Sequence, residues 1–198
     1  MADYAYLSLW FRKFAVERGL HHLEALLQLF PQSAARPGFR LVVRSLGPEE
    51  SPTLERDLIA APADVRALAS EFLHEDTAYE VTAWWDLWQP QRRQTGTSAP
   101  PGWEQAASPV EFVLEGEEYD PSREPGAREH IVATLGPEDL YLSSEQPQDD
   151  AGPRRENARR LHALLRDIQK SLPLARLVLW SEGREDFAEA TRRLVSQP

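Results

Sequence analysis

Apolar residues at every second position open the chain. Ala5, Leu7, Leu9 and Phe11 occupy one side of this alternation, and more polar or amphipathic residues fill the positions between them. A period of two places successive side chains on opposite faces of a strand. The pattern therefore predicts a β-strand over residues 4–11 with one buried face.

The next pattern has a helical period. Leu20, Leu23, Leu27 and Phe30 recur at intervals of three and four residues, which places them on one side of an α-helix. Pro31 cannot continue the helix. We expect a helix from about residue 16 to Phe30 that buries this apolar stripe.

The rest of the chain follows with the same two periods and with turn signals between them. The predicted strands are residues 39–46, 53–59, 79–88, 110–114, 131–135, 140–142 and 175–180, and the predicted helices are residues 62–73, 156–172 and 185–195.

The order of these elements predicts an α+β protein of two tandem ferredoxin-like (split βαβ) halves. Residues 1–89 give the complete order β-α-β-β-α-β. Residues 90–108 are rich in Gln, Pro, Gly, Ser and Thr and are expected to be a linker. Residues 109–198 form the second half, which lacks the first helix and ends in an extra one. Antiparallel sheets with helices on one face are expected, and the second half should pack on the first.

A short internal repeat favours divergent duplication. Residues 42–50 (VVRSLGPEE) align with residues 131–139 (IVATLGPED), 89 positions later. Both segments read as a strand that enters a Leu-Gly-Pro-acid turn, and both are followed by a loop, an amphipathic helix and a strand with aromatic residues.

Composition describes a globular and acidic protein. Among 198 residues, 41% are hydrophobic and 27% are charged, with a net charge of −10. The net negative charge opposes nucleic-acid binding, which requires a basic surface. Basic residues are nearly all arginine, with Lys13 and Lys170 the lysines, which fits a GC-rich bacterial coding sequence.

The negative charge is concentrated in one part of the chain. Residues 104–150 hold thirteen acidic residues and two basic ones, a net charge of −11, so the remainder is close to neutral. Such a segment is either a solvated region that favours solubility or a docking surface for a basic protein. If it docks a partner, we expect four residues to take part: Glu115, Glu117, Glu118 and Asp120.

Several classes of chemistry have no support in the sequence. The chain has no cysteine, which favours a reducing compartment. Residues 1–4 are not followed by the apolar stretch typical of a signal peptide, and no apolar run reaches membrane-spanning length. We therefore expect a cytoplasmic protein. The five histidines lack metal-ligand spacing and are interpreted as surface or capping residues. No phosphate loop or nucleophile elbow occurs. We expect no metal, no cofactor and no catalytic residue.

Aromatic residues mark a second place of interest. If Ala5, Leu7 and Leu9 face the helices, the alternation puts Tyr6 and Trp10 on the other face of the sheet. Trp84 and Trp88 share one face of the strand at residues 79–88 in the same way. An aromatic sheet face is either an interface between the two halves or a binding site.

These features leave two functional hypotheses. The first is a non-enzymatic protein-binding module of the inhibitor or toxin-immunity type, which presents an acidic surface to a basic protein partner. The second is a small-molecule binder or enzyme with a pocket between the halves, lined by Tyr6, Trp10, Trp84 and Trp88. The sequence does not determine the oligomeric state.

Overall fold

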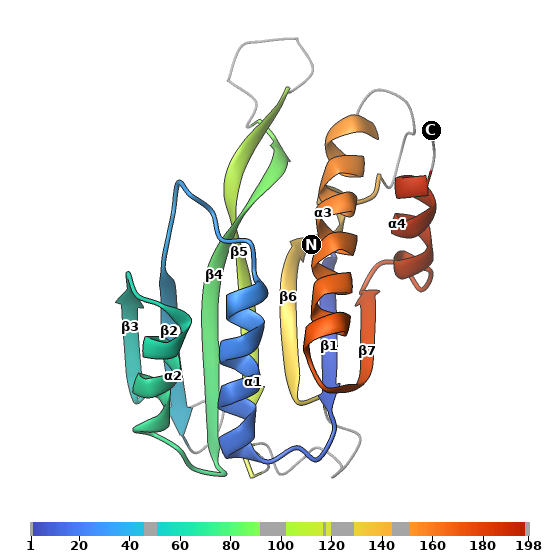
Figure 1. Ribbon diagram of the computed structural model, residues 1–198. Helices are drawn as coiled ribbons and strands as arrows, with labels where there is room; N and C mark the ends of the chain where they lie inside the picture. The colour runs from blue at the N-terminus through green and yellow to red at the C-terminus, as the bar shows by residue number, and fades with distance from the viewer. Residues whose placement is uncertain are drawn as a thin grey trace.

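The computed structural model describes residues 2–45, 51–91, 102–116, 118–119, 129–143 and 151–196 (Figure 1). Within them the chain is α+β, with seven strands, four α-helices and one short 3-10 helix. In chain order the elements are β1 (Tyr4–Phe11), α1 (Val16–Leu29), β2 (Phe39–Ser45), β3 (Leu54–Leu58), α2 (Pro62–Ser70), β4 (Thr77–Pro90), β5 (Trp103–Glu115), β6 (Ile131–Pro137), η1 (Glu138–Leu140), α3 (Ala151–Ser171), β7 (Leu174–Ser181) and α4 (Phe187–Ser196).

All seven strands belong to one antiparallel sheet with the order β3-β2-β4-β5-β6-β1-β7. The ladder between β4 and β5 is the longest and runs from Ala78 opposite Glu115 to Pro90 opposite Trp103. The sheet has β3 at one edge and β7 at the other. β1, the first strand of the chain, lies next to the β7 edge, between β6 and β7.

Local sequence explains where the first helices begin and end. α1 ends where Phe30 adopts an extended conformation before Pro31, as the proline requires. α2 begins with Pro62 at its first turn, and the Asp64 carboxylate accepts a hydrogen bond from the Ala61 N–H at 3.0 Å. The apolar stripe of α1 is buried, including Leu20, Leu23 and Leu27, as its spacing predicts.

The helices lie on one face of the sheet, and one continuous core fills the space between (Figure 1). This core joins residues from both ends of the chain, because Leu7 and Leu9 of β1 belong to the same cluster as Phe112 of β5 and Ile168 of α3. Phe30, Trp85 and Phe112 meet edge to face at its centre, with ring centroids 5.2–5.7 Å apart.

The strand order differs from the split βαβ arrangement expected for residues 1–89. A self-contained ferredoxin-like half would place β1 beside strands of its own half, whereas β1 pairs with β6 and β7 of the second half. In place of two separate sheets there is one, which crosses from one half to the other at the β4–β5 ladder.

Element boundaries differ in two further places. β4 and β5 extend into the range expected to be a linker, with Pro90 and residues 103–108 in strand conformation. Residues 140–142 are not a strand, because η1 turns the chain there and Tyr141 N–H bonds back to the Glu138 carbonyl at 3.0 Å.

The two copies of the repeat have different neighbours. Both begin in strands, β2 and β6, but β2 lies between β3 and β4 while β6 lies between β5 and β1. Residues 46–50, the end of the first copy, lie outside the described residues. Duplication of an ancestral half therefore stays a prediction.

Among the described residues, no helix has both the length and the apolar composition needed to span a bilayer.

One buried side chain holds α3 against the last residues of β4. Asn157 is fully buried, and its amide donates to the carbonyls of Trp88 at 2.8 Å and Leu140 at 2.9 Å. Its amide oxygen accepts a hydrogen bond from the Trp88 N–H at 2.9 Å. Arg160 donates to the carbonyl of Asp86 two residues earlier. These side chains bond to the backbone of β4 at Asp86 and Trp88, beyond the residues that pair with β2 and with Gln32.

We predict that Asn157→Ala lowers the free energy of unfolding by about 3 kcal/mol, because it leaves three backbone groups without their partner. Urea unfolding followed by circular dichroism measures this change. Arg159→Ala on the same helix, at an exposed position, is the matched control and should change stability by less than about 0.5 kcal/mol. Equal effects of the two substitutions would contradict the bridging role.

Candidate functional site

The side of the sheet opposite the helices is a candidate binding face. No helix of the described residues lies on it (Figure 1). Alternation along β1 sends Leu7 and Leu9 into the core and Tyr6 and Trp10 to this open face, as predicted from the sequence. We call this side the open face.

A rigid aromatic pair stands on the open face. Tyr6 of β1 and Trp180 of β7 stack with ring centroids 4.5 Å apart and an interplanar angle of 19°. The Trp180 indole N–H donates to Ser8 Oγ at 2.9 Å, and the Tyr6 hydroxyl donates to Glu182 Oε1 at 2.8 Å. Burial and the hydrogen bond to Glu182 raise the pKa of Tyr6 to about 12. Because the polar atoms are satisfied internally, the pair offers a fixed apolar surface.

An apolar row runs beside this pair. Register places Val113 of β5 opposite Val132 of β6, then Ser8 of β1, then Val178 of β7. The three valines are only partly buried. Ser8, which is buried beneath Trp180, interrupts the row. Partly exposed apolar side chains beside aromatic rings are typical of the centre of protein interfaces.

A groove of about 260 Å³ lies on the same face. Its floor is formed by β6, which contributes the small residues Thr134 and Gly136. Glu111 of β5 lies on one side of β6 and Tyr4 of β1 on the other. Gly136 has φ of +94°, a conformation that favours glycine, as the chain leaves β6 for η1.

Charged side chains lie on both sides of the open face. On its β3-β2-β4 side, Arg40 pairs with Glu55 and Arg44 pairs with Glu80 at 2.8 Å, while Asp57 of β3 has no Lys or Arg partner among the described residues. On the β5-β6-β1-β7 side, Glu111 and Glu182 have no Lys or Arg partner within 4.0 Å among the described residues, and the guanidinium group of Arg176 lies over the Trp10 ring.

Glu111 is the more unusual of these two carboxylates. Within the described ranges, no hydrogen bond or ion pair reaches its side chain. Neighbouring protein atoms withdraw water from the carboxyl group and raise its pKa, and the charge of Glu80 raises it further while Arg44 acts in the opposite direction. We name the set Tyr4, Tyr6, Glu111, Trp180 and Glu182 the aromatic–acidic face.

The structure does not gather the four predicted aromatic residues into one pocket. β5 and β6 separate β1, which bears Tyr6 and Trp10, from β4. Arg176 covers the ring of Trp10, with its guanidinium carbon 4.7 Å from the ring centroid, and Arg36 covers Trp84 at 3.9 Å. One face of each of these two indole rings is therefore in contact with an arginine of the same chain.

Trp88 connects β4 to α3. It is half-buried, and both its backbone N–H and its carbonyl bond to the Asn157 side chain, so it lies at the junction of β4 with α3.

The predicted acidic residues lie at one end of the sheet. Glu115 is the half-buried last residue of β5, opposite Ala78, and Glu118 is exposed in the following turn. Glu117 and Asp120 lie outside the described residues. The turn docks on the start of β4, where the Glu118 N–H donates to the Glu75 carbonyl at 2.8 Å.

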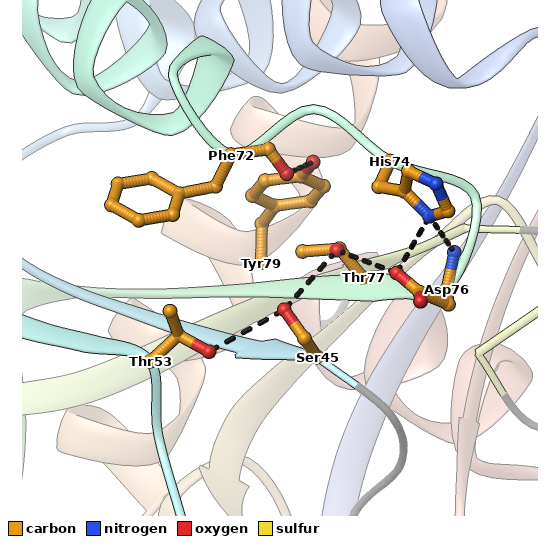
Figure 2. A network of polar contacts seen from close by, with 7 residues as sticks. All are labelled: Ser45, Thr53, Phe72, His74, Asp76, Thr77 and Tyr79. Atoms are coloured by element: carbon orange, nitrogen blue, oxygen red, sulfur yellow. Dashed lines mark hydrogen bonds and ion pairs between the residues drawn. The ribbon is translucent and has the colours of Figure 1, made fainter.

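A network of hydrogen bonds among polar side chains lies at the same end of the sheet (Figure 2). Asp76 Oδ1 lies 2.8 Å from His74 Nδ1 and accepts a hydrogen bond from the Thr77 hydroxyl at 3.2 Å. Thr77 Oγ1 lies 3.5 Å from Ser45 Oγ, to which the Thr53 hydroxyl donates at 3.4 Å. Since an ionised carboxylate only accepts, the hydroxyl donors point toward Asp76.

This network is an anchor for the sheet. It joins the ends of β2 and β4 to the segment before β3, and the adjacent Tyr79 hydroxyl donates to the Phe72 carbonyl at 3.0 Å (Figure 2). His74 contacts the Asp76 carboxylate and not one of the hydroxyl groups.

A second cleft, of about 350 Å³, lies on the helix side between α1, α3 and β4. It thus lies between elements of the two predicted halves, where the small-molecule hypothesis expects a pocket. Its indole is Trp85 and not one of the predicted residues, and Arg160 and Asp167 of α3 supply charge. Within the described residues, no group of three or more side chains could hold a metal ion.

Sequence reasoning did not single out Glu111, Trp180 or Glu182. Alternation in the strand at residues 175–180 could have placed Trp180 on the open face, since Leu177 and Leu179 take the core side. Glu111 was one of thirteen acidic residues in residues 104–150. Its position in the groove, without an ion-pair partner among the described residues, depends on its neighbours in β4 and β6, which the sequence alone does not identify.

Comparison of the chain with protein-family models, with curated proteins and with solved structures found no match. The geometry of the open face therefore carries the functional argument.

Two histidines form part of an aromatic cluster at the end of β1, where the sequence predicted surface or capping roles. His130 stacks on Phe14 at 4.0 Å, and its Nδ1 accepts the Phe11 N–H at 2.8 Å. His22 stacks on Phe11 at 4.1 Å. Burial lowers the pKa of both rings, and each lies near another histidine whose charge lowers it further.

This cluster predicts a loss of stability in mild acid. The native pKa of His130 lies below its ordinary value of 6.5, so below about pH 6.5 the unfolded chain binds protons that the native ring does not. The free energy of unfolding should be unaffected by this group above pH 7 and should fall as the pH decreases toward 5. Urea unfolding at several pH values measures the slope.

His130→Gln keeps an acceptor for the Phe11 N–H and removes the titrating ring, so its slope between pH 7 and pH 5 should be smaller than that of the native protein. Identical slopes for native protein and His130→Gln would show that the prediction is wrong.

Proposed function

We propose that this protein is a non-enzymatic protein-binding module that docks a basic partner on its aromatic–acidic face. The observation that carries the proposal is a combination of side chains on the β5-β6-β1-β7 side of the open face. There, a rigid Tyr6–Trp180 pair lies with two carboxylates, Glu111 and Glu182, that have no cationic partner within the described residues.

The two components have different roles in binding. Trp and Tyr anchors supply most of the binding energy in protein interfaces when they are rigid and become buried. Carboxylates around them attract a basic partner and increase its association rate. The net charge of −11 over residues 104–150 extends this field beyond the face.

An inhibitor or immunity-type role is the form of this function that we favour, in the cytoplasm of a bacterium. A protein of this type can mask a basic active site with an acidic surface, and it needs no catalytic groups of its own. This form of the proposal rests on composition and charge.

The test is a binding measurement with a purified partner. The protein, immobilised, would isolate candidates from its own host, and each candidate would then be produced separately and titrated by calorimetry. Trp180→Ala should weaken a specific complex by about 30-fold, equivalent to about 2 kcal/mol. The affinity should also fall as the salt concentration rises.

Trp103→Ala is the matched control, since Trp103 lies beneath Arg154 of α3 and not on the aromatic–acidic face. It should leave the affinity within about twofold of native. A partner that binds Trp180→Ala as tightly as the native protein, with no dependence on salt, would contradict the proposal.

The cleft between α1, α3 and β4 supports a second candidate function, the binding of a small molecule. Its volume of about 350 Å³ falls within the range of roughly 300–1,000 Å³ usual for ligand sites, and it combines an apolar wall with charged groups. A metabolite screen should then find a compound that raises the melting temperature and changes tryptophan emission. Ala163→Phe, which fills the cleft, should abolish both effects; a compound that still acts on this variant would exclude the cleft as its site.

A further inference from the structure

We propose that the groove on the open face receives an arginine side chain of the docked partner, with its guanidinium group against Glu111 and Tyr4. This inference rests on the proposed function, because it assigns the partner residue that enters the aromatic–acidic face.

The dimensions of the groove fit one long side chain. At about 260 Å³ it is smaller than the roughly 300–1,000 Å³ of typical small-molecule sites. β5 and β1 flank the single strand β6, so the walls stand roughly 10 Å apart. Thr134 is paired with Glu111 on one side and with Tyr6 on the other, which leaves a short side chain between two longer ones.

The charge of the groove favours a cation. Glu111 is exposed at the groove, and no described residue donates a hydrogen bond to its carboxylate. The guanidinium of Arg44 is directed to Glu80, with its Nε 2.8 Å from Glu80 Oε1. Its carboxylate oxygens are therefore open to a charge-assisted hydrogen bond from an incoming cation.

Arginine fits better than lysine for two reasons. A planar guanidinium can bond to both carboxylate oxygens while stacking on an aromatic ring, and it is less strongly hydrated than an ammonium group. Tyr4, at 38% exposure, supplies an accessible ring in the groove wall. The chain itself uses the same contact three times, with guanidinium carbons 3.9–4.8 Å from indole centroids in the pairs Arg36–Trp84, Arg154–Trp103 and Arg176–Trp10.

The test uses three short peptides that differ at one position: acetyl-Gly-Xaa-Gly-amide with arginine, lysine or citrulline as Xaa. Titration into ¹⁵N-labelled protein, followed by NMR, should shift the backbone amides of Glu111, Thr134 and Gly136 with the arginine peptide. The lysine peptide should bind about fivefold more weakly, and the uncharged citrulline peptide should produce no shift at these amides.

Glu111→Gln should weaken the arginine peptide at least about tenfold. Thr134→Leu, which raises the floor of the groove and keeps the carboxylate, should do the same. Glu17→Gln, at an exposed glutamate in the first turn of α1 on the helix side of the sheet, is the matched control and should bind like the native protein. The native spectrum of each variant establishes that it is folded.

Equal binding of the arginine and citrulline peptides would overturn the arginine site, and so would native affinity in both Glu111→Gln and Thr134→Leu. Tighter binding of free arginine than of the arginine peptide would also overturn it, because the groove would then be a metabolite site. The proposed function fails separately, through an unchanged partner affinity in Trp180→Ala, since Trp180 does not line the groove.

Discussion

The pairing of β1 with β6 on one side and β7 on the other is the constraint on which the second half of this molecule depends. β7 has no other neighbour in the sheet, so β1 holds it in place. The same strand supplies Tyr6 to stack on Trp180 and Tyr4 to form one wall of the groove. The binding face is therefore assembled from the first and last strands of the chain, and neither predicted half contains it alone.

Local patterns predicted the elements well and their arrangement poorly. The strand at residues 4–11 and the helix that ends before Pro31 agree with β1 and α1, because period and proline act within a few residues. Strand order depends on which edges meet in space. Several strands of the chain have similar alternation, so β1 could have paired within residues 1–89 or, as observed, with β6 and β7.

The same limit applies to the candidate site. Alternation placed Tyr6 and Trp10 on the correct face, but only the fold shows that Arg176 covers Trp10 while Trp180 stacks on Tyr6. Sequence proximity grouped Glu115 with Glu111 in one acidic segment. In the sheet, Glu115 ends β5 near the anchored turn at Asp76, whereas Glu111 faces the groove.

The open face also shows why a partner is a better explanation than solubility alone. If a sheet face needs only to remain in water, paired charges suffice, and Arg40–Glu55 and Arg44–Glu80 provide them over β3, β2 and β4. Over β5, β6, β1 and β7 the chain places partly buried valines, a stacked aromatic pair and carboxylates without a cationic partner among the described residues. Exposed apolar surface is unfavourable in water. It becomes favourable when a surface that is apolar at its centre and basic at one edge covers it.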